Sequence, residues 1–139
     1  MKVAEATSAW QVYEGNYSGK PLYARFNTAF RQAGDTADYP IQLGVAIPLN
    51  NPDQHGLPAS AELDELAAIE DLIVEKVAGN AVLVGAITTN SMREFVLYTN
   101  NADWIEGFDH SMQEALAGHT VQVMAKTDPK WDVYGQFVD

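Results

Sequence analysis

The sequence predicts an α+β two-layer sandwich with a ferredoxin-like βαββαβ core, an added N-terminal β-hairpin and a C-terminal strand. Two observations lead to this fold class: from Pro40 onward the segments follow the order strand, helix, hairpin, helix, strand, and both helical segments carry an apolar stripe. In the split βαβ unit, which has this order, both helices lie on one face of an antiparallel sheet. The 139 residues, 47% of them hydrophobic, suffice for one core, so we expect a single domain over residues 1–139.

Two stretches near the N-terminus predict the added hairpin. Residues 9–14 and 21–30 alternate as strands do, and residues 16–19 form the turn, because Gly19 takes positive φ without steric cost. Alternation places these side chains of the second strand on one face: Leu22, Ala24, Phe26, Thr28 and Phe30. The side chains expected on the other face of the hairpin are Tyr13, Tyr23, Arg25 and Asn27.

The core begins with a strand, a loop and the most regular helix pattern of the chain. Residues 40–49 predict the strand, and residues 50–58, which contain proline and glycine, predict the loop. Residues 60–78 predict the helix, with Ser60 as its N-cap, acidic residues in its first turn and Gly79 as its stop. The apolar stripe expected to be buried is Leu63, Leu66, Ile69, Ile73 and Val77.

The second half of the core repeats these elements in a different order. Residues 81–89 and 92–99 predict a hairpin joined by Asn90-Ser91, and residues 103–117 predict a second helix. The buried stripe of that helix is expected to be Ile105, Phe108, Met112 and Leu116. Residues 120–126 predict the last core strand, and residues 131–138 predict a C-terminal strand after the break at Asp128-Pro129.

Composition excludes several classes of function. Eight Lys and Arg against 19 Asp and Glu give a formal net charge of −11, which opposes direct contact with nucleic acid. The absence of cysteine excludes a zinc–cysteine cluster, a disulfide framework and thiol catalysis. The chain has no signal-like segment and no apolar run long enough to cross a membrane, so we expect a cytoplasmic protein without membrane contact.

The acidic residues gather on the predicted helices. Seven of the 19 lie between Asp53 and Lys76 and four more between Asn101 and Gly118, and Lys76 is the single cation in these two segments. With both helices on one face of the sheet, their outer surfaces form one acidic patch. Such a patch is either a solvated surface or a docking surface for a basic protein segment. In the second case, the residues expected to bind the partner are Glu65, Glu70, Asp71 and Glu106.

A second candidate site lies on the predicted strands. An arginine flanked by tyrosines can hold a carboxylate or phosphate with two hydrogen bonds. The residues of this alternative, an anionic-ligand site, are Tyr13, Arg25, Asn27, Arg93 and Tyr98. The competing interpretation is an exposed sheet face on which arginine stacks against aromatic rings.

No catalytic, metal or cofactor site is predicted. The chain has no Gly-x-Ser-x-Gly elbow, no phosphate-binding loop and no Gly-x-Gly-x-x-Gly fingerprint. Glu106, His110 and Glu114 share one helical side, but His110 lies far around the helix from the buried stripe, so a hydrated surface is the favoured interpretation. These patterns favour a non-enzymatic binding or regulatory module.

Several short motifs are distributed along the chain from Trp10 to Phe137. They include Arg93-Glu94-Phe95 followed by Leu97-Tyr98-Thr99, and an Asp-Pro-x-Trp-x-x-Tyr-x-x-Phe ending over residues 128–137. With Gly19-Lys20-Pro21 and Arg25-Phe26-Asn27, these motifs resemble the bacterial family of unknown function DUF695.

The resemblance implies a protein-binding role and no catalytic residues. The family is associated with the regulator of ribonuclease E activity B, whose members are acidic α+β proteins that inhibit the endoribonuclease by binding it. In the family, Leu-Tyr-Pro often follows the last Phe, whereas here the chain continues with Val138-Asp139, which argues against a function tied to the extreme C-terminus.

Overall fold

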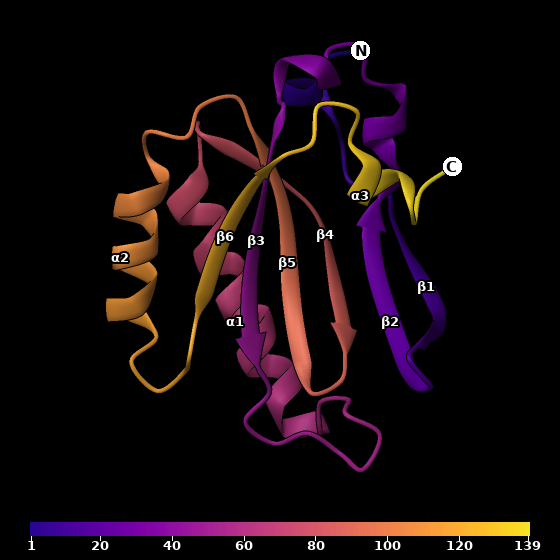
Figure 1. Cartoon of the computed structure of the whole chain (residues 1–139), viewed down its shortest axis with the longest axis vertical. Helices are drawn as coiled ribbons and strands as arrows, with labels where there is room; N and C mark the ends of the chain where they lie inside the picture. The colour runs from indigo at the N-terminus through magenta and orange to yellow at the C-terminus, as the bar shows by residue number, and fades with distance from the viewer.

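One antiparallel sheet of six strands organises the chain in the computed structural model, which describes residues 1–139. The strand order is β1-β2-β4-β5-β3-β6, and every neighbouring pair is antiparallel (Figure 1). The strands are β1 (Trp10–Tyr17), β2 (Lys20–Asn27), β3 (Ile41–Pro48), β4 (Ala81–Thr89), β5 (Met92–Thr99) and β6 (Gln122–Thr127). The predicted α+β class is therefore confirmed, and the N-terminal hairpin extends the sheet beyond β4.

The first hydrophobic core lies between the sheet and two helices on one of its faces. In the view of Figure 1, helix α1 (Ser60–Val77) lies behind the sheet and helix α2 (Ile105–Ala115) lies to the left, beside its β6 edge. Their buried side chains pack against the alternate residues of β3 and β5 that face them. The fully buried members of this core are Leu43, Val45, Ile47, Leu66, Ile73, Phe95, Leu97 and Met112.

A second core covers part of the opposite face. Short helix α3 (Asp132–Gly135) lies in front of the sheet in Figure 1, with the N-terminal segment above it. Its Trp131 and Tyr134 pack with the alternate residues of β2, β4 and β5 that point to this face, Phe26, Val84 and Tyr98 among them. The lower part of this face, over β6, β3 and β5, carries no helix (Figure 1).

The predicted C-terminal strand is wrong, because the segment forms α3 instead. Trp131, Tyr134 and Val138 are buried at spacings of three and four residues, the spacing of one helical face and not of a strand. The carboxylate of Asp128 accepts hydrogen bonds from the backbone N–H groups of Asp132 (2.8 Å) and Val133 (3.2 Å), which stabilises the start of the helix.

The hairpin was predicted with the wrong end for its second strand. Strand β2 ends at Asn27, and residues Thr28–Gln32 form a 3-10 helix. The side-chain oxygen of Asn27 accepts hydrogen bonds from the N–H groups of Ala29 (3.0 Å) and Ala9 (3.1 Å), which stabilises the turn of the chain out of the sheet. The alternation of Leu22, Ala24 and Phe26 onto one face is confirmed, since these side chains share the second core.

Two details of the first helix also differ from the prediction. The N-cap is Ala59 and not Ser60, and no side chain caps the helix. Leu63 is 47% exposed, so it does not belong to the buried stripe, which begins at Leu66. Buried Glu62 takes the position one turn before Leu66 and accepts hydrogen bonds from the N–H groups of Asn50 (2.6 Å) and Asn51 (2.9 Å).

The other predicted elements are confirmed with small shifts. Strands β4 and β5 have the predicted bounds, and the two turn residues between them, Asn90 and Ser91, both take positive φ. Helix α2 begins at Ile105 and ends at Ala115, and Phe108 and Met112 are its buried residues. None of the helices has the length and apolar character that a membrane span requires.

Candidate functional site

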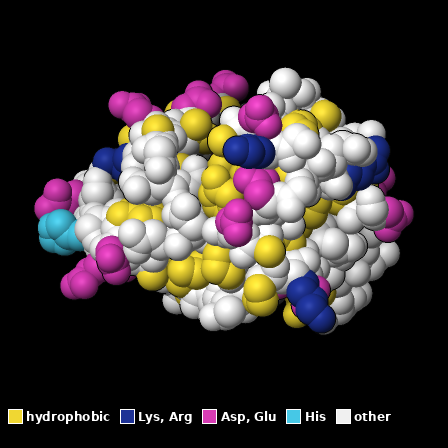
Figure 2. All heavy atoms as spheres, turned by 90° about the horizontal axis from the view of Figure 1, so that it is seen from above, with side chains coloured by type: hydrophobic (Ala, Val, Ile, Leu, Met, Phe, Trp, Pro, Cys, Tyr) yellow, Lys and Arg dark blue, Asp and Glu magenta, His cyan; other side chains and the backbone are white.

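The outer surfaces of α1 and α2 carry six exposed carboxylates. We define the acidic helical face by its exposed carboxylates: Asp64, Glu65, Asp71 and Glu75 on α1, and Glu106 and Glu114 on α2. In Figure 2, Asp and Glu side chains lie along the upper rim and the left end of the molecule, where the two helices are located. The sequence prediction that the helices carry the acidic surface is therefore realised in the fold.

Few cationic or potentially cationic side chains lie near this face, and each contacts a neighbouring side chain. Lys76 is the one Lys or Arg on either helix, and its ammonium donates a hydrogen bond to the hydroxyl of Ser111 across the gap between the helices. His110 lies 3.0 Å from Glu114, and His119 contacts Glu65. Each histidine contacts a single carboxylate and Lys76 adds one positive charge, so acids outnumber cations on this face and its field toward solvent is negative.

The four residues predicted to bind a partner do not have equivalent positions. Asp71 and Glu106 are exposed and make no hydrogen bond or ion pair with another side chain. Glu65 is 46% exposed and contacts His119, whereas the side chain of Glu70 is only 18% exposed. Both oxygens of Glu70 accept hydrogen bonds from Arg25, each of 2.9 Å, so this residue supports the packing of α1 on the sheet.

Arg25 and Arg93 lie on the helix-facing side of the sheet and line a hollow of about 160 Å³, together with Tyr23 and Thr88. The guanidinium of Arg25 lies 4.3 Å above the ring of Trp10, and its hydrogen bonds to Glu70 raise the pKa of Arg25. Arg93 donates from Nε to the hydroxyl of Thr88 (2.8 Å), and its two terminal nitrogens have no acceptor in the protein. Burial lowers the pKa of Arg93.

The tyrosines predicted for this site lie on the opposite face of the sheet. Tyr98 is fully buried, stacks on Trp131 with ring centroids 4.0 Å apart, and donates a hydrogen bond of 2.6 Å to Asp128. Tyr13 packs edge-on against Phe137. The prediction that Tyr13 shares a face with Arg25 is wrong, because the register pairs Val12 with Arg25 and the alternation of β1 then turns Tyr13 away.

Asn27 also has a structural role, because its side chain binds backbone groups. Its side chain holds the segment before β1, accepting from the N–H of Ala9 and donating to the carbonyl of Thr7 (3.0 Å). Of the five residues of the predicted anionic-ligand site, the structure therefore brings together Arg25 and Arg93 only.

Sequence reasoning missed Glu94, which lies on the sheet face opposite the helices. Its side chain is partly buried and makes no hydrogen bond or ion pair, and burial raises the pKa of its carboxyl. The available signal was the alternation of β5, in which Glu94 stands between Met92 and Val96 on one face. A carboxylate at such a position is rarely buried without a partner.

Comparison with known protein families identifies the family to which the chain is similar. The model of a family described as a family of unknown function (DUF695) matches residues 8–138, nearly the whole chain. No curated protein and no solved structure matches it. The match confirms the family resemblance inferred from the sequence motifs.

Proposed function

The chain belongs to the DUF695 family, whose function is not known, and from its surfaces we propose that it is a non-enzymatic module that binds a basic segment of another protein and regulates that protein. The observation that carries the proposal is the acidic helical face, formed by two helices that are far apart in sequence, are linked by the contact of Lys76 with Ser111, and each present exposed carboxylates. Complementary charge speeds the encounter of two proteins and selects between partners.

The engagement of the nearby cations supports this role. Lys76 donates to Ser111 and forms no ion pair with Asp71 or Glu75, so these two carboxylates have no directly paired cation. The proposal also agrees with the association expected from the resemblance, in which the regulator of ribonuclease E activity B acts by binding a protein.

We also propose a fold type for the segment of the chain that carries the acidic helical face. The strand order β4-β5-β3-β6, with both helices packed in one core against the same sheet face, supports a ferredoxin-like split βαβ unit. In this arrangement both helices pack on the sheet through buried side chains of the first core, which supports the acidic face.

The test measures association of a short synthetic peptide of alternating lysine and alanine with two charge-matched variants. The first variant, Asp71→Lys with Glu75→Lys and Glu106→Lys, reverses exposed acids on the acidic helical face. The second, Glu14→Lys with Asp38→Lys and Asp139→Lys, reverses three exposed acids elsewhere and changes the net charge by the same amount. Each is measured at about 0.05 M and about 0.5 M NaCl, which shortens the Debye length from about 14 Å to about 4 Å.

We expect the first variant to reduce the association rate about tenfold at low salt and the second to reduce it much less, because the local field steers the peptide. High salt removes the difference. Equal reduction by both variants would show that net charge alone attracts the peptide, and the proposed surface would be rejected.

A second candidate function, binding of a small anion, is supported by the free terminal nitrogens of Arg93. A guanidinium without an acceptor, in a hollow lined also by Arg25, suits one carboxylate or phosphate group. Stabilisation of the protein by sodium acetate or phosphate that disappears in Arg93→Ala would favour this candidate over the peptide.

A further inference from the structure

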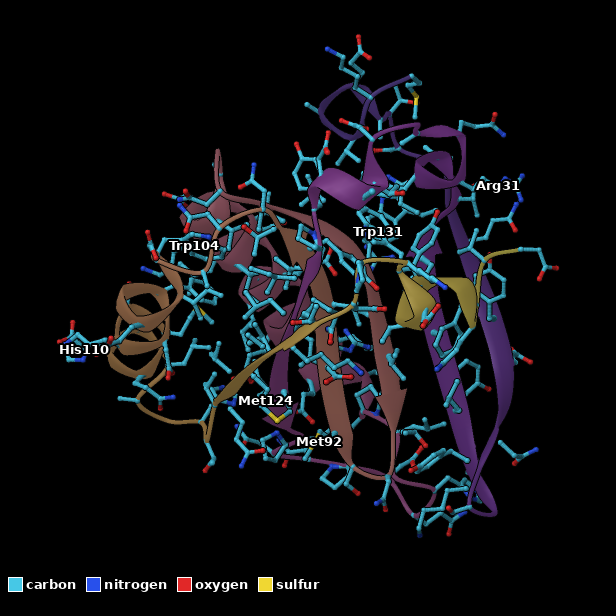
Figure 3. The ribbon with its side chains drawn as sticks, turned by 45° about the horizontal axis from the view of Figure 1, so that its top comes forward. Arg31, Met92, Trp104, His110, Met124 and Trp131 are labelled. Atoms are coloured by element: carbon cyan, nitrogen blue, oxygen red, sulfur yellow. The ribbon has the colours of Figure 1, made fainter.

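The lower part of the sheet face opposite the helices contains a trough between β5 and β6. Figure 3 shows Met92 and Met124 side by side on this face, below Trp131. Two hollows of about 330 Å³ and about 350 Å³ adjoin here and share two lining residues, Glu94 and Met124. We define the sheet trough by the floor residues Gly44 and Ala46 of β3 and the wall residues Met92, Glu94 and Met124.

The floor of the sheet trough leaves room for the side chain of Glu94 to lie across it. A Cβ at Gly44 would stand 2.7 Å from Oε2 of Glu94, so the carboxylate lies against the bare Cα of Gly44 and does not extend into solvent. Ala46 is paired with Glu94 across the strands, and its small side chain leaves space above the adjacent part of the floor. Glu94 is thereby held at the junction of the two hollows.

The carboxylate of Glu94 has no partner in the protein. No hydrogen bond donor and no cation lies within bonding distance, and Lys126, in the second hollow, acts on it only at longer range. Burial without hydrogen bonds disfavours the charged form, and a cation placed in the trough would reverse this effect.

The two hollows differ in character on either side of Glu94. The smaller one is lined by five apolar residues, among them Ile87, Met92 and Met124, and by the neutral polar residues Thr89, Asn90 and Gln122; Glu94 is its one charged residue. The larger one contains Lys126. An amphiphilic cation would therefore place its charge at Glu94 and its apolar part over Met92, Ile87 and Met124, away from Lys126.

We propose that the sheet trough binds an aliphatic monoamine, whose ammonium pairs with Glu94 and whose alkyl chain lies on the two methionines and Ile87. The flexible thioethers of Met92 and Met124, 38% and 52% exposed, adapt to an alkyl chain. A diamine fits less well because its second ammonium lies over Ile87 and the two methionines or approaches Lys126. A second copy of the chain is disfavoured by the net charge of −11 on each molecule.

The test is an NMR titration of the protein with hexylammonium chloride, observed through carbon-13-labelled methionine methyl groups. The chain has four methionines. Met92 and Met124 report on the sheet trough, whereas Met112, fully buried in the first core, and exposed Met1 are internal controls. We expect saturable shifts at Met92 and Met124 alone, and weaker binding of hexane-1,6-diammonium and of hexan-1-ol.

Two variants separate the charge from the shape of the site. Glu94→Gln keeps the shape and removes the charge, and we expect it to weaken hexylammonium binding about tenfold while leaving the hexan-1-ol shifts unchanged. Gln122→Lys adds a cation at an exposed lining position, cannot disturb the core, and should weaken ammonium binding as well. Unchanged Met112 signals in each variant verify that it is folded.

Three outcomes would overturn the proposal. Equal affinity for hexylammonium and hexan-1-ol would show that Glu94 does not contribute. Hexylammonium binding unaffected by both variants would place the amine elsewhere. Tighter binding of an acetylated, amidated lysine than of hexylammonium would assign the trough to a protein side chain and not to a free amine.

Discussion

At the scale of single residues, Gly85 shows how one absent side chain permits the second core. The ring of Phe26, on the neighbouring strand β2, lies directly over Gly85: a Cβ built there would be 2.3 Å from the ring. Phe26 in turn stacks on Phe137, with centroids 4.7 Å apart and planes inclined by 12°. The contact of the C-terminal segment with the sheet therefore depends on the close approach of a ring to bare backbone.

We predict that Gly85→Ala lowers the free energy of unfolding by about 1–3 kcal/mol, because the ring must leave its position in a filled core. Gly15→Ala is the matched control, since Gly15 also lies in a strand and nothing stands within 4 Å of the Cβ position. Urea denaturation of both variants measures the difference. Similar unfolding midpoints for the two would show that Phe26 can move at little cost.

At the scale of elements, α3 is held on the sheet by hydrogen bonds as well as by apolar contact. Asp128 accepts from the hydroxyl of Tyr98 and from the N–H groups at the start of α3, and Tyr134 donates to the carbonyl of Asn27 at 2.6 Å. Trp131 takes φ = 55°, a left-handed conformation that is costly for a large side chain. Its stacking on Tyr98 and its hydrogen bond to the carbonyl of Tyr39 (3.0 Å) offset that cost.

These contacts shift the pKa values of the groups involved. Burial raises the pKa of Tyr134 to about 12 and raises that of Tyr98 even more. Burial also acts to raise the pKa of Asp128, but the hydrogen bonds from Tyr98 and the backbone outweigh it, and the net pKa is lowered.

From the tyrosine pKa values we predict a loss of stability at alkaline pH. A tyrosine whose pKa is raised by folding contributes stability that is complete below the unfolded pKa of about 10 and is lost as the pH rises toward the folded value. Unfolding free energy should therefore fall between pH of about 10 and about 12, and Tyr98→Phe should reduce the slope. At neutral pH the same variant should lose about 1–2 kcal/mol, because Asp128 loses a donor.

The control for this prediction is Tyr17→Phe, since Tyr17 is 61% exposed. Urea midpoints at pH of about 7.5 and about 10.5 give the comparison. If Tyr98→Phe and Tyr17→Phe had the same pH dependence, other titrating groups would account for the alkaline loss.

At the scale of the whole molecule, most charged side chains lie outside the two cores, and Glu62 and Asp128 are the buried acids. The acids gather over α1 and α2, and the ion pair of Arg25 with Glu70 is the one Arg–carboxylate pair in the structure. The formal net charge of the 139-residue chain is −11. The excess negative charges repel one another in the compact folded state, and this repulsion lowers its stability.

We predict that salt stabilises the protein, because it screens this repulsion. The melting temperature should rise between about 0.01 M and about 0.3 M NaCl, over which the Debye length falls from about 30 Å to about 6 Å. The variant with Asp71→Lys, Glu75→Lys and Glu106→Lys should show a smaller rise. A melting temperature independent of salt in the wild-type protein would contradict the role given to self-repulsion.

The elements with strong periodic patterns were predicted closely. The turn residues Asn90 and Ser91 set the ends of β4 and β5, and the stripe from Leu66 to Val77 marked α1. Segment 131–138 was misread because its aromatic residues fit a strand by composition, whereas Asp128 favours a helix through its contacts. The contacts of Asp128 depend on its position next to Tyr98. These two residues are 30 positions apart in the chain and come together only in the fold.

For the candidate site, the sequence by itself determined which charges the helices carry, because helical periodicity is a local property. It did not determine which of these charges are free: Glu70 is bound by Arg25 from a strand 45 residues away, and Asp71, its neighbour, is exposed. The register of β1 with β2 likewise decided that Tyr13 and Arg25 lie on opposite faces. The isolation of Glu94 over Gly44 was decided by the pairing of β5 with β3, since partners across a sheet are brought together only when the chain folds.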